Sequence, residues 1–260
     1  MYTVSKNTKL ISYSLIGIGL IALTMGFYND PHRAWPSLMV NNYFFLGISA
    51  FAIFFIALQY VSEASWAIPF KRVAEGITSY FIVGGVIMLL IIVAGKLHWN
   101  HIWHWMVDGI MDPNHKYYDP IIAGKEAYLN FPFFFIRSVA YIFGWWYASK
   151  RLIALSRQED VEGGLISYKR SITLSAIFIV FFGYSSSMMA WDWIMSIDTH
   201  WFSTLFGWFV FSSMGVTGFT MIAMISIVLK RKGFLKYVNE NHIHDLGKWI
   251  FAFSILWTYM

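Results

Sequence analysis

The chain has 260 residues, of which 58% are hydrophobic, 20% aromatic and only 13% charged, with a mean hydropathy of +0.55. This composition excludes a soluble globular domain, so the net charge of +5 is assigned to membrane topology and no nucleic-acid partner is expected. The absence of cysteine excludes disulfides, cysteine-ligated iron–sulfur clusters and covalently attached c-type haem within the chain.

Six apolar runs are long enough to cross a bilayer, which takes about 20 residues in a helix. They are 10–28, 40–62, 77–95, 131–150, 172–190 and 204–229. Continuous runs favour helices, because the strands of a membrane β-barrel alternate in polarity. The predicted fold is all-α, a polytopic transmembrane helix bundle that forms one integral membrane domain over residues 1–260.

A seventh apolar run begins at Gly247 and reaches Met260 after about 14 residues. That length is short of a ~30 Å hydrocarbon core at 1.5 Å per residue. We therefore expect six complete spans and the start of a seventh, with the given sequence cut inside the seventh helix.

Lysine and arginine are unevenly distributed between the two sides of these spans. Fourteen lie at the N-terminus or after the second, fourth and sixth spans, and four lie on the other side. The fourteen are Lys6, Lys9, Lys71, Arg72, Lys150, Arg151, Arg157, Lys169, Arg170, Lys230, Arg231, Lys232, Lys236 and Lys248. The positive-inside rule then predicts a cytoplasmic N-terminus and an extracytoplasmic loop at 96–130.

This loop contains histidines three residues apart, at His98, His101 and His104, interleaved with tryptophans. Such spacing suits a metal because these side chains share one helical face. Tryptophan-rich stretches at a membrane boundary are more typical of an interfacial helix. We interpret the stretch as an interfacial helix and expect no metal site.

The segment 189–204, called the hinge below, separates the fifth and sixth runs and contains Asp192, Asp198 and His200. Ionisable groups beside hydrocarbon are costly, and a cluster of them indicates a functional site. The tryptophans of the same segment also fit an aromatic belt with ordinary loop acids. Both interpretations stay open.

Arg137 lies about six residues inside the fourth span. An arginine at that depth pairs with a carboxylate or lines a wet cavity, and Asp192 is the nearest acid by depth. We predict that the two side chains pair. The pair serves either the site or only the locking of two helices.

Four charges gather at the cytoplasmic ends of the second and third spans, among them Glu63, Arg72 and Glu75. They suit the entry of a proton pathway, and they equally suit flank residues whose charges reach the interface.

The eight histidines fall in predicted loops or at their edges, so the spans offer no ligands for a b-type haem. We expect this chain to bind no metal and no haem. Its polar groups suit proton movement and hydrogen bonding to a quinone head, which needs partners at its oxygens and an apolar slot.

Three stretches carry a resemblance to a known family: 59–66 with 71–73, the hinge and its continuation 191–207, and 241–248. Together they resemble the ActF membrane subunits of bacterial alternative complex III, a quinol:electron-acceptor oxidoreductase. These subunits are similar to the NrfD/polysulfide-reductase-type membrane family. The likeness runs over essentially the whole chain, and the hinge motif is its most specific part.

The resemblance implies a multi-pass subunit of the bacterial inner membrane that is not catalytic alone. Its partners would be the homologous ActC subunit, extracytoplasmic subunits with haem c and iron–sulfur clusters, a terminal oxidase, and lipids. The family quinol site is assigned more firmly to ActC, so binding of quinone or menaquinone by this chain stays open. Family members have more than seven spans.

Two other functions stay open beside a proton pathway with a quinone pocket. A secondary transporter would use Arg137 and the hinge acids as an ion or substrate site, although paired broken helices at mid-membrane are not evident. A purely structural anchor of a multisubunit complex would need no chemistry in the hinge.

Overall fold

The computed structural model describes residues 5–260, and in this part of the chain the regular structure is entirely helical. The α-helices are α1 (Lys6–Asn29), α2 (Pro31–Val61), α3 (Lys71–Ile77), α4 (Tyr80–Lys96), α5 (Pro120–Ala123), α6 (Phe131–Glu162), α7 (Ile166–Trp193), α8 (Phe206–Arg231) and α9 (Glu240–Tyr259). Short 3₁₀ helices are η1 (Ile68–Phe70), η2 (His104–Met106) and η3 (Met195–Ile197). The predicted all-α membrane bundle is confirmed.

Within residues 5–260, five helical stretches are long and apolar enough to cross a membrane. They are α1, α2, the stretch from η1 to α4, the stretch from α7 to η3, and α8. The remaining predicted span, 131–150, forms the first part of α6. Arg137 and the tyrosine and tryptophan side chains make α6 less apolar than these five, and it packs along α4 and α7.

Helix starts are set by capping side chains that the apolar runs do not reveal. The Asp30 side chain accepts a hydrogen bond from the Arg33 N–H, and Pro31 occupies the first turn, so α2 begins well before residue 40. Likewise α9 begins at Glu240 and not at Gly247, because Asn239 and His242 form a capping box.

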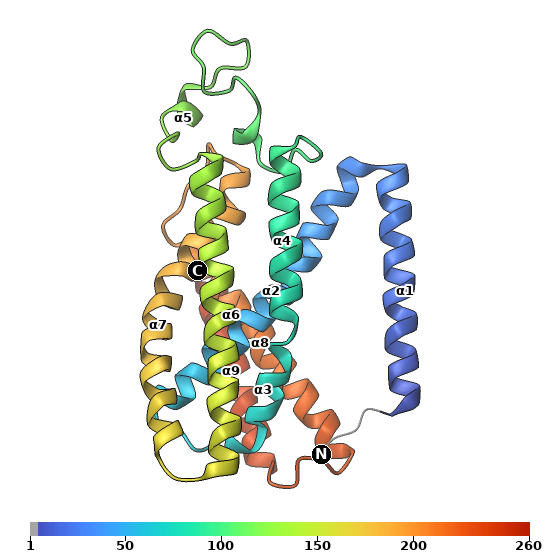
Figure 1. Cartoon of the computed structure of the whole chain (residues 1–260), viewed down its shortest axis with the longest axis vertical. Coiled ribbons are helices and arrows are strands. Elements are labelled where there is room, and N and C mark those ends of the chain that lie inside the picture. Colours follow the sequence, from blue (N-terminus) through green and yellow to red (C-terminus); the bar gives the residue numbers. More distant parts are fainter. Residues whose placement is uncertain (1–4) are drawn as a thin grey trace.

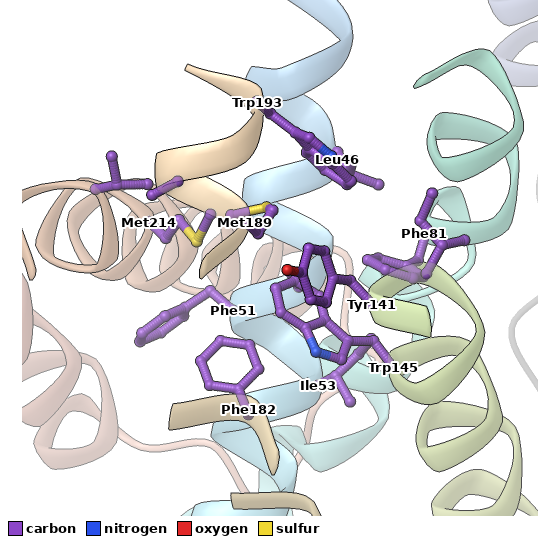
Figure 2. Close-up of a cluster of buried hydrophobic side chains, with 14 of the residues drawn as sticks. Leu46, Phe51, Ile53, Phe81, Tyr141, Trp145, Phe182, Met189, Trp193 and Met214 are labelled. Atoms are coloured by element: carbon purple, nitrogen blue, oxygen red, sulfur yellow. The ribbon is translucent and has the colours of Figure 1, made fainter. Parts of the chain in front are cut away.

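The second helix is the centre of the bundle, because it packs against α4, α7 and α8 (Figure 1). Its middle part is buried on nearly all sides. Aromatic rings from several helices fill the core around it, as Figure 2 shows for Phe51, Trp145 and Phe182. The rings of Trp145 and Phe182 lie 4.8 Å apart, which fixes α6 against α7.

The first helix stands apart from the bundle and contacts α2 (Figure 1). It has no buried residue, and its surface is apolar all round. A helix with this composition is stable where lipid surrounds it.

The loops alternate between two ends of the bundle (Figure 1). The start of α1 and the turns α6–α7 and α8–α9 lie at one end, while the loop with α5 lies at the other. We call these the basic end and the hinge end. The hinge reaches the second, beside the α5 loop.

Candidate functional site

Asp192 is completely buried near the end of α7, and Arg137 of α6 faces it. Arg137 Nε lies 2.8 Å from Asp192 Oδ2, and Nη2 lies 2.8 Å from Oδ1. Two parallel charge-assisted hydrogen bonds of this kind are the strongest geometry available to arginine. The predicted pairing of Arg137 with Asp192 is confirmed.

Two tyrosines complete the hydrogen bonding of the Asp192 carboxylate. The Tyr128 hydroxyl donates to Oδ1 at 2.7 Å, and the Tyr141 hydroxyl donates to Oδ2 at 2.9 Å. Each carboxylate oxygen therefore accepts two hydrogen bonds, one from arginine and one from a phenol. This full satisfaction offsets much of the desolvation cost of a buried charge.

The loop before α6 also holds the guanidinium. The backbone carbonyl of Tyr128 accepts hydrogen bonds from both terminal nitrogens of Arg137 at 3.3 Å. The Cζ atom of the Arg137 guanidinium lies 4.0 Å from the centroid of the Tyr128 ring and 4.1 Å from that of the Phe133 ring. Cation–π stacking adds to the pairing. Burial, and then the Asp192 charge, raises the pKa of Tyr128, so its hydroxyl stays a donor at neutral pH.

The tryptophan-rich stretch of the α5 loop packs inward on the hinge. Trp103 Nε1 donates to the Trp193 carbonyl at 3.3 Å, and Trp105 Nε1 donates to the Ser196 hydroxyl at 3.4 Å. That hydroxyl donates in turn to the Asp192 carbonyl. The prediction of an interfacial helix here is wrong, because the only helical turn of the stretch is η2 and the indole N–H groups of Trp103 and Trp105 find partners inside, while Trp99 is exposed.

Asp198 and His200 lie on the exposed face of the hinge. The Asp198 side chain accepts from the His200 backbone N–H at 3.2 Å, while His200 Nε2 pairs with Asp119 at 2.8 Å. Asp119 also caps α5, accepting from the N–H groups of Ile121 and Ile122. The structure thus brings the His200 ring to Asp119, an acid of the 96–130 loop that the sequence analysis did not single out.

The pKa of Asp119 is lowered from its ordinary value. Partial burial opposes this shift, but the two backbone N–H groups at the start of α5 and the neighbouring His200 outweigh it. The carboxylate therefore stays charged at neutral pH and holds the hinge to the α5 loop.

An apolar cavity of about 370 Å³ lies beside Tyr128, whose hydroxyl donates to the buried carboxylate. Tyr128 and Trp191 line it together with Ser196, Thr199 and Phe202. Trp191 Nε1 is buried and has no hydrogen-bond partner within residues 5–260. A buried donor without a partner is costly, and a ligand carbonyl would satisfy it.

At the basic end, Glu75 is buried and accepts hydrogen bonds from Arg72 and, at 2.7 Å, from the Ser156 hydroxyl. Arg72 also pairs with Asp160 of α6. Two of the three sequence candidates here therefore form one network that joins α3 to α6, and α6 supplies an acid that the sequence did not single out.

The third candidate, Glu63, is exposed and adopts a left-handed backbone conformation with φ of 50°. It lines a cavity of about 490 Å³. In the same cavity Lys71 lies 3.8 Å from Glu159, and the Tyr60 hydroxyl donates to Glu159 at 3.3 Å. Glu63 is thus near, but outside, the Arg72–Glu75 network.

The histidines of the α5 loop have other partners than a metal. His98 pairs with Asp108 at 3.1 Å, and the ring of His101 stacks on that of His32 with centroids 5.9 Å apart. Within the described residues, no group of three or more potential ligands is arranged to hold a metal ion.

Comparison of the chain with protein-family models finds no match, and comparison with curated proteins finds no similar chain. What the protein does is therefore inferred from its own residues and from the resemblance of its motifs.

Proposed function

We propose that this chain is a membrane subunit of a quinol-oxidising respiratory complex of the alternative complex III type. It lies in the bacterial inner membrane with its N-terminus in the cytoplasm. It contributes a proton pathway and a quinone pocket at the hinge, and it passes no electrons through centres of its own. Haem c and iron–sulfur clusters belong to partner subunits, beside the homologous ActC subunit.

One observation carries the proposal: an apolar cavity is lined by Tyr128, whose hydroxyl donates to the buried Asp192 carboxylate, and by Trp191, whose buried indole N–H has no partner within residues 5–260. A quinone needs a donor at a carbonyl and an apolar slot for its ring and tail. Trp191 offers the donor, and the cavity offers the slot. Tyr128 lines the cavity and holds the Asp192 carboxylate at the same time.

Proton release would use the exposed groups of the hinge. The His200–Asp119 pair lies at the protein surface, where an imidazole and a carboxylate can pass a proton to water. Asp198, two residues away, is exposed and keeps one carboxylate oxygen for a proton or a water chain. Asp192, held by Arg137, serves as a fixed charge that positions Tyr128 beside the cavity.

A structural anchor is the second candidate, and the saturation of Asp192 by four donors favours it. A buried carboxylate whose lone pairs all accept hydrogen bonds is what a purely structural contact between two helices requires. The two functions differ in whether the hinge groups change state during turnover.

The assembly itself gives the first test. Purification of the native complex through a tag on this chain should recover c-type haem subunits, visible in a reduced-minus-oxidised spectrum. Recovery of this chain alone, active in transport, would contradict the proposal.

Binding gives the second test. In the purified complex, Trp191→Phe keeps an aromatic side chain, although a smaller one, and removes the unpaired N–H, so the Kd for a quinone analogue should rise about fivefold, the value of one hydrogen bond of ~1 kcal/mol. Trp208→Phe, at an exposed tryptophan of α8, is the matched control. An unchanged Kd in Trp191→Phe would remove this cavity as the quinone pocket.

A further inference from the structure

A second groove lies between α6 and α7 toward the basic end, away from the hinge. It has a volume of about 410 Å³, and its lining contains three cations and no carboxylate. The lining residues are Tyr147, Arg151, Leu155, Lys169, Arg170, Thr173, Leu174 and Ile177. A groove with this charge balance attracts an anion.

The groove follows from the helical repeat. Residues 147, 151 and 155 are four apart, so they share one face of α6, and residues 170, 174 and 177 share the opposing face of α7. The two helices are closely packed just inside the groove, where a Cβ at Gly144 would lie 2.4 Å from the ring of Phe181.

The three cations are uncompensated in the described part of the chain, since Arg151, Lys169 and Arg170 form no ion pair there. The three acids at the end of α6 have other partners, because Glu159 pairs with Lys71, Asp160 pairs with Arg72, and Glu162 accepts hydrogen bonds from Gln158. An anion from outside the chain would neutralise charges that the protein leaves free.

The groove is amphipathic along its length. Lys169 and Arg170 lie in the first turns of α7, whereas Leu174 and Ile177 lie further into the apolar part of that helix. Tyr147 and Ile177 are exposed beside the groove, with 48% and 65% of their surfaces accessible. On α7 the cations thus occupy the outer end and the apolar surface continues toward the membrane interior, while on α6 Arg151 lies between Tyr147 and Leu155.

We propose that this groove binds an anionic phospholipid, with its phosphate on Arg151, Lys169 and Arg170 and an acyl chain along Leu174 and Ile177. Basic pockets between membrane helices recognise such headgroups. Three cations match a headgroup with two phosphates, as in a diphosphatidylglycerol, better than a single charge. The site lies at the opposite end of the bundle from the hinge and does not depend on the proposed function.

The test uses native mass spectrometry of the purified protein, titrated with diphosphatidylglycerol, with phosphatidylcholine and with inorganic diphosphate. The triple variant R151Q/K169Q/R170Q should weaken binding of the anionic lipid about 100-fold, as expected for three surface cations at the membrane. The triple variant K230Q/R231Q/K232Q removes the same charge at the end of α8 and should leave this binding within about twofold.

Three results would overturn the proposal. One is unchanged lipid binding in the groove variant, and another is an equal loss in both triple variants, which would indicate general electrostatic attraction. The third is that inorganic diphosphate binds as tightly as the lipid with the same dependence on these residues. If the triple variant does not assemble, R151Q alone should still weaken lipid binding, and no weakening would refute the site.

Discussion

Replacement of Arg137 by methionine would leave the Asp192 carboxylate fully buried with two phenol donors and no counter-charge. Breaking one side of a buried pair costs roughly 3–5 kcal/mol, because the remaining charge is uncompensated. Asp192→Asn should cost a similar amount, since it leaves the guanidinium uncompensated. We therefore expect each single variant to lower the unfolding free energy by about that amount.

The double variant Arg137→Met with Asp192→Asn removes both charges and keeps an acceptor for one tyrosine. Its loss should be about 1–3 kcal/mol, which is the value of the hydrogen bonds that remain unmatched. The double variant should thus be more stable than either single variant, with a coupling free energy of about 3 kcal/mol or more.

Unfolding of the detergent-solubilised protein, followed by circular dichroism against denaturant, measures the four species of this cycle. Tyr141→Phe is a control that keeps both charges, removes one hydrogen bond to the Asp192 carboxylate and should cost about 1.5–3 kcal/mol. Additive losses in the double variant would refute a direct and energetically significant contact between Arg137 and Asp192.

Two further predictions concern topology and pH. Single cysteines placed at His115 and Leu235 of this cysteine-free chain should lie on opposite sides of the membrane. An impermeant thiol reagent added to intact cells should therefore label His115→Cys and leave Leu235→Cys unlabelled. Labelling of both from outside would overturn the orientation. Because the folded-state pKa of Asp119 is lowered, its stabilising contribution is full above the ordinary pKa of about 3.9 and is lost as pH falls through the folded value. In the wild type, proteolysis of the α5 loop should therefore be slow at pH 7 and become faster only in acid. In Asp119→Asn the rate of proteolysis should lose this acid dependence. A rise in the rate centred near pH 6 that persists in Asp119→Asn would contradict the role given to Asp119.

The buried charge pair could be predicted because helix geometry converts sequence position into depth. Arg137 and Asp192 lie at similar depths on opposing helices, and a charge at that depth requires a partner. The same reasoning could have predicted Tyr141 as a neighbour of the pair, since it follows Arg137 by one helical turn on α6.

The contacts between the α5 loop and the hinge could not be predicted, because no repeating pattern of residues in the sequence indicates them. Trp103 and the Trp193 carbonyl are 90 residues apart, and only the closed tertiary structure brings them together. The same is true of His200 and Asp119, whose signal in the sequence is a turn before Pro120. Spacing of histidines and tryptophans suggested a helix where long-range hydrogen bonds instead fix an irregular loop.

Helix boundaries show a similar division. Apolar runs locate the membrane-spanning parts of α1, α2, α7 and α8, because hydrocarbon imposes a length on them. Capping by Asp30 and Asn239 extends α2 and α9 beyond the apolar runs, and α6 continues well past its predicted end into a charged helix. These extensions depend on local hydrogen bonds, which hydropathy does not report.

The most direct test of the proposed function is quinol-dependent turnover, with its coupled proton release, in complexes that contain Asp198→Asn or His200→Gln. Asp198→Asn keeps the size of the side chain and its acceptor for the His200 N–H but removes its titration. We predict normal assembly, judged by the haem spectrum of the purified complex, with reduced turnover or reduced proton release in both variants. Assembled complexes with normal turnover and normal proton release would show that the hinge is an interfacial belt and takes no part in proton transfer.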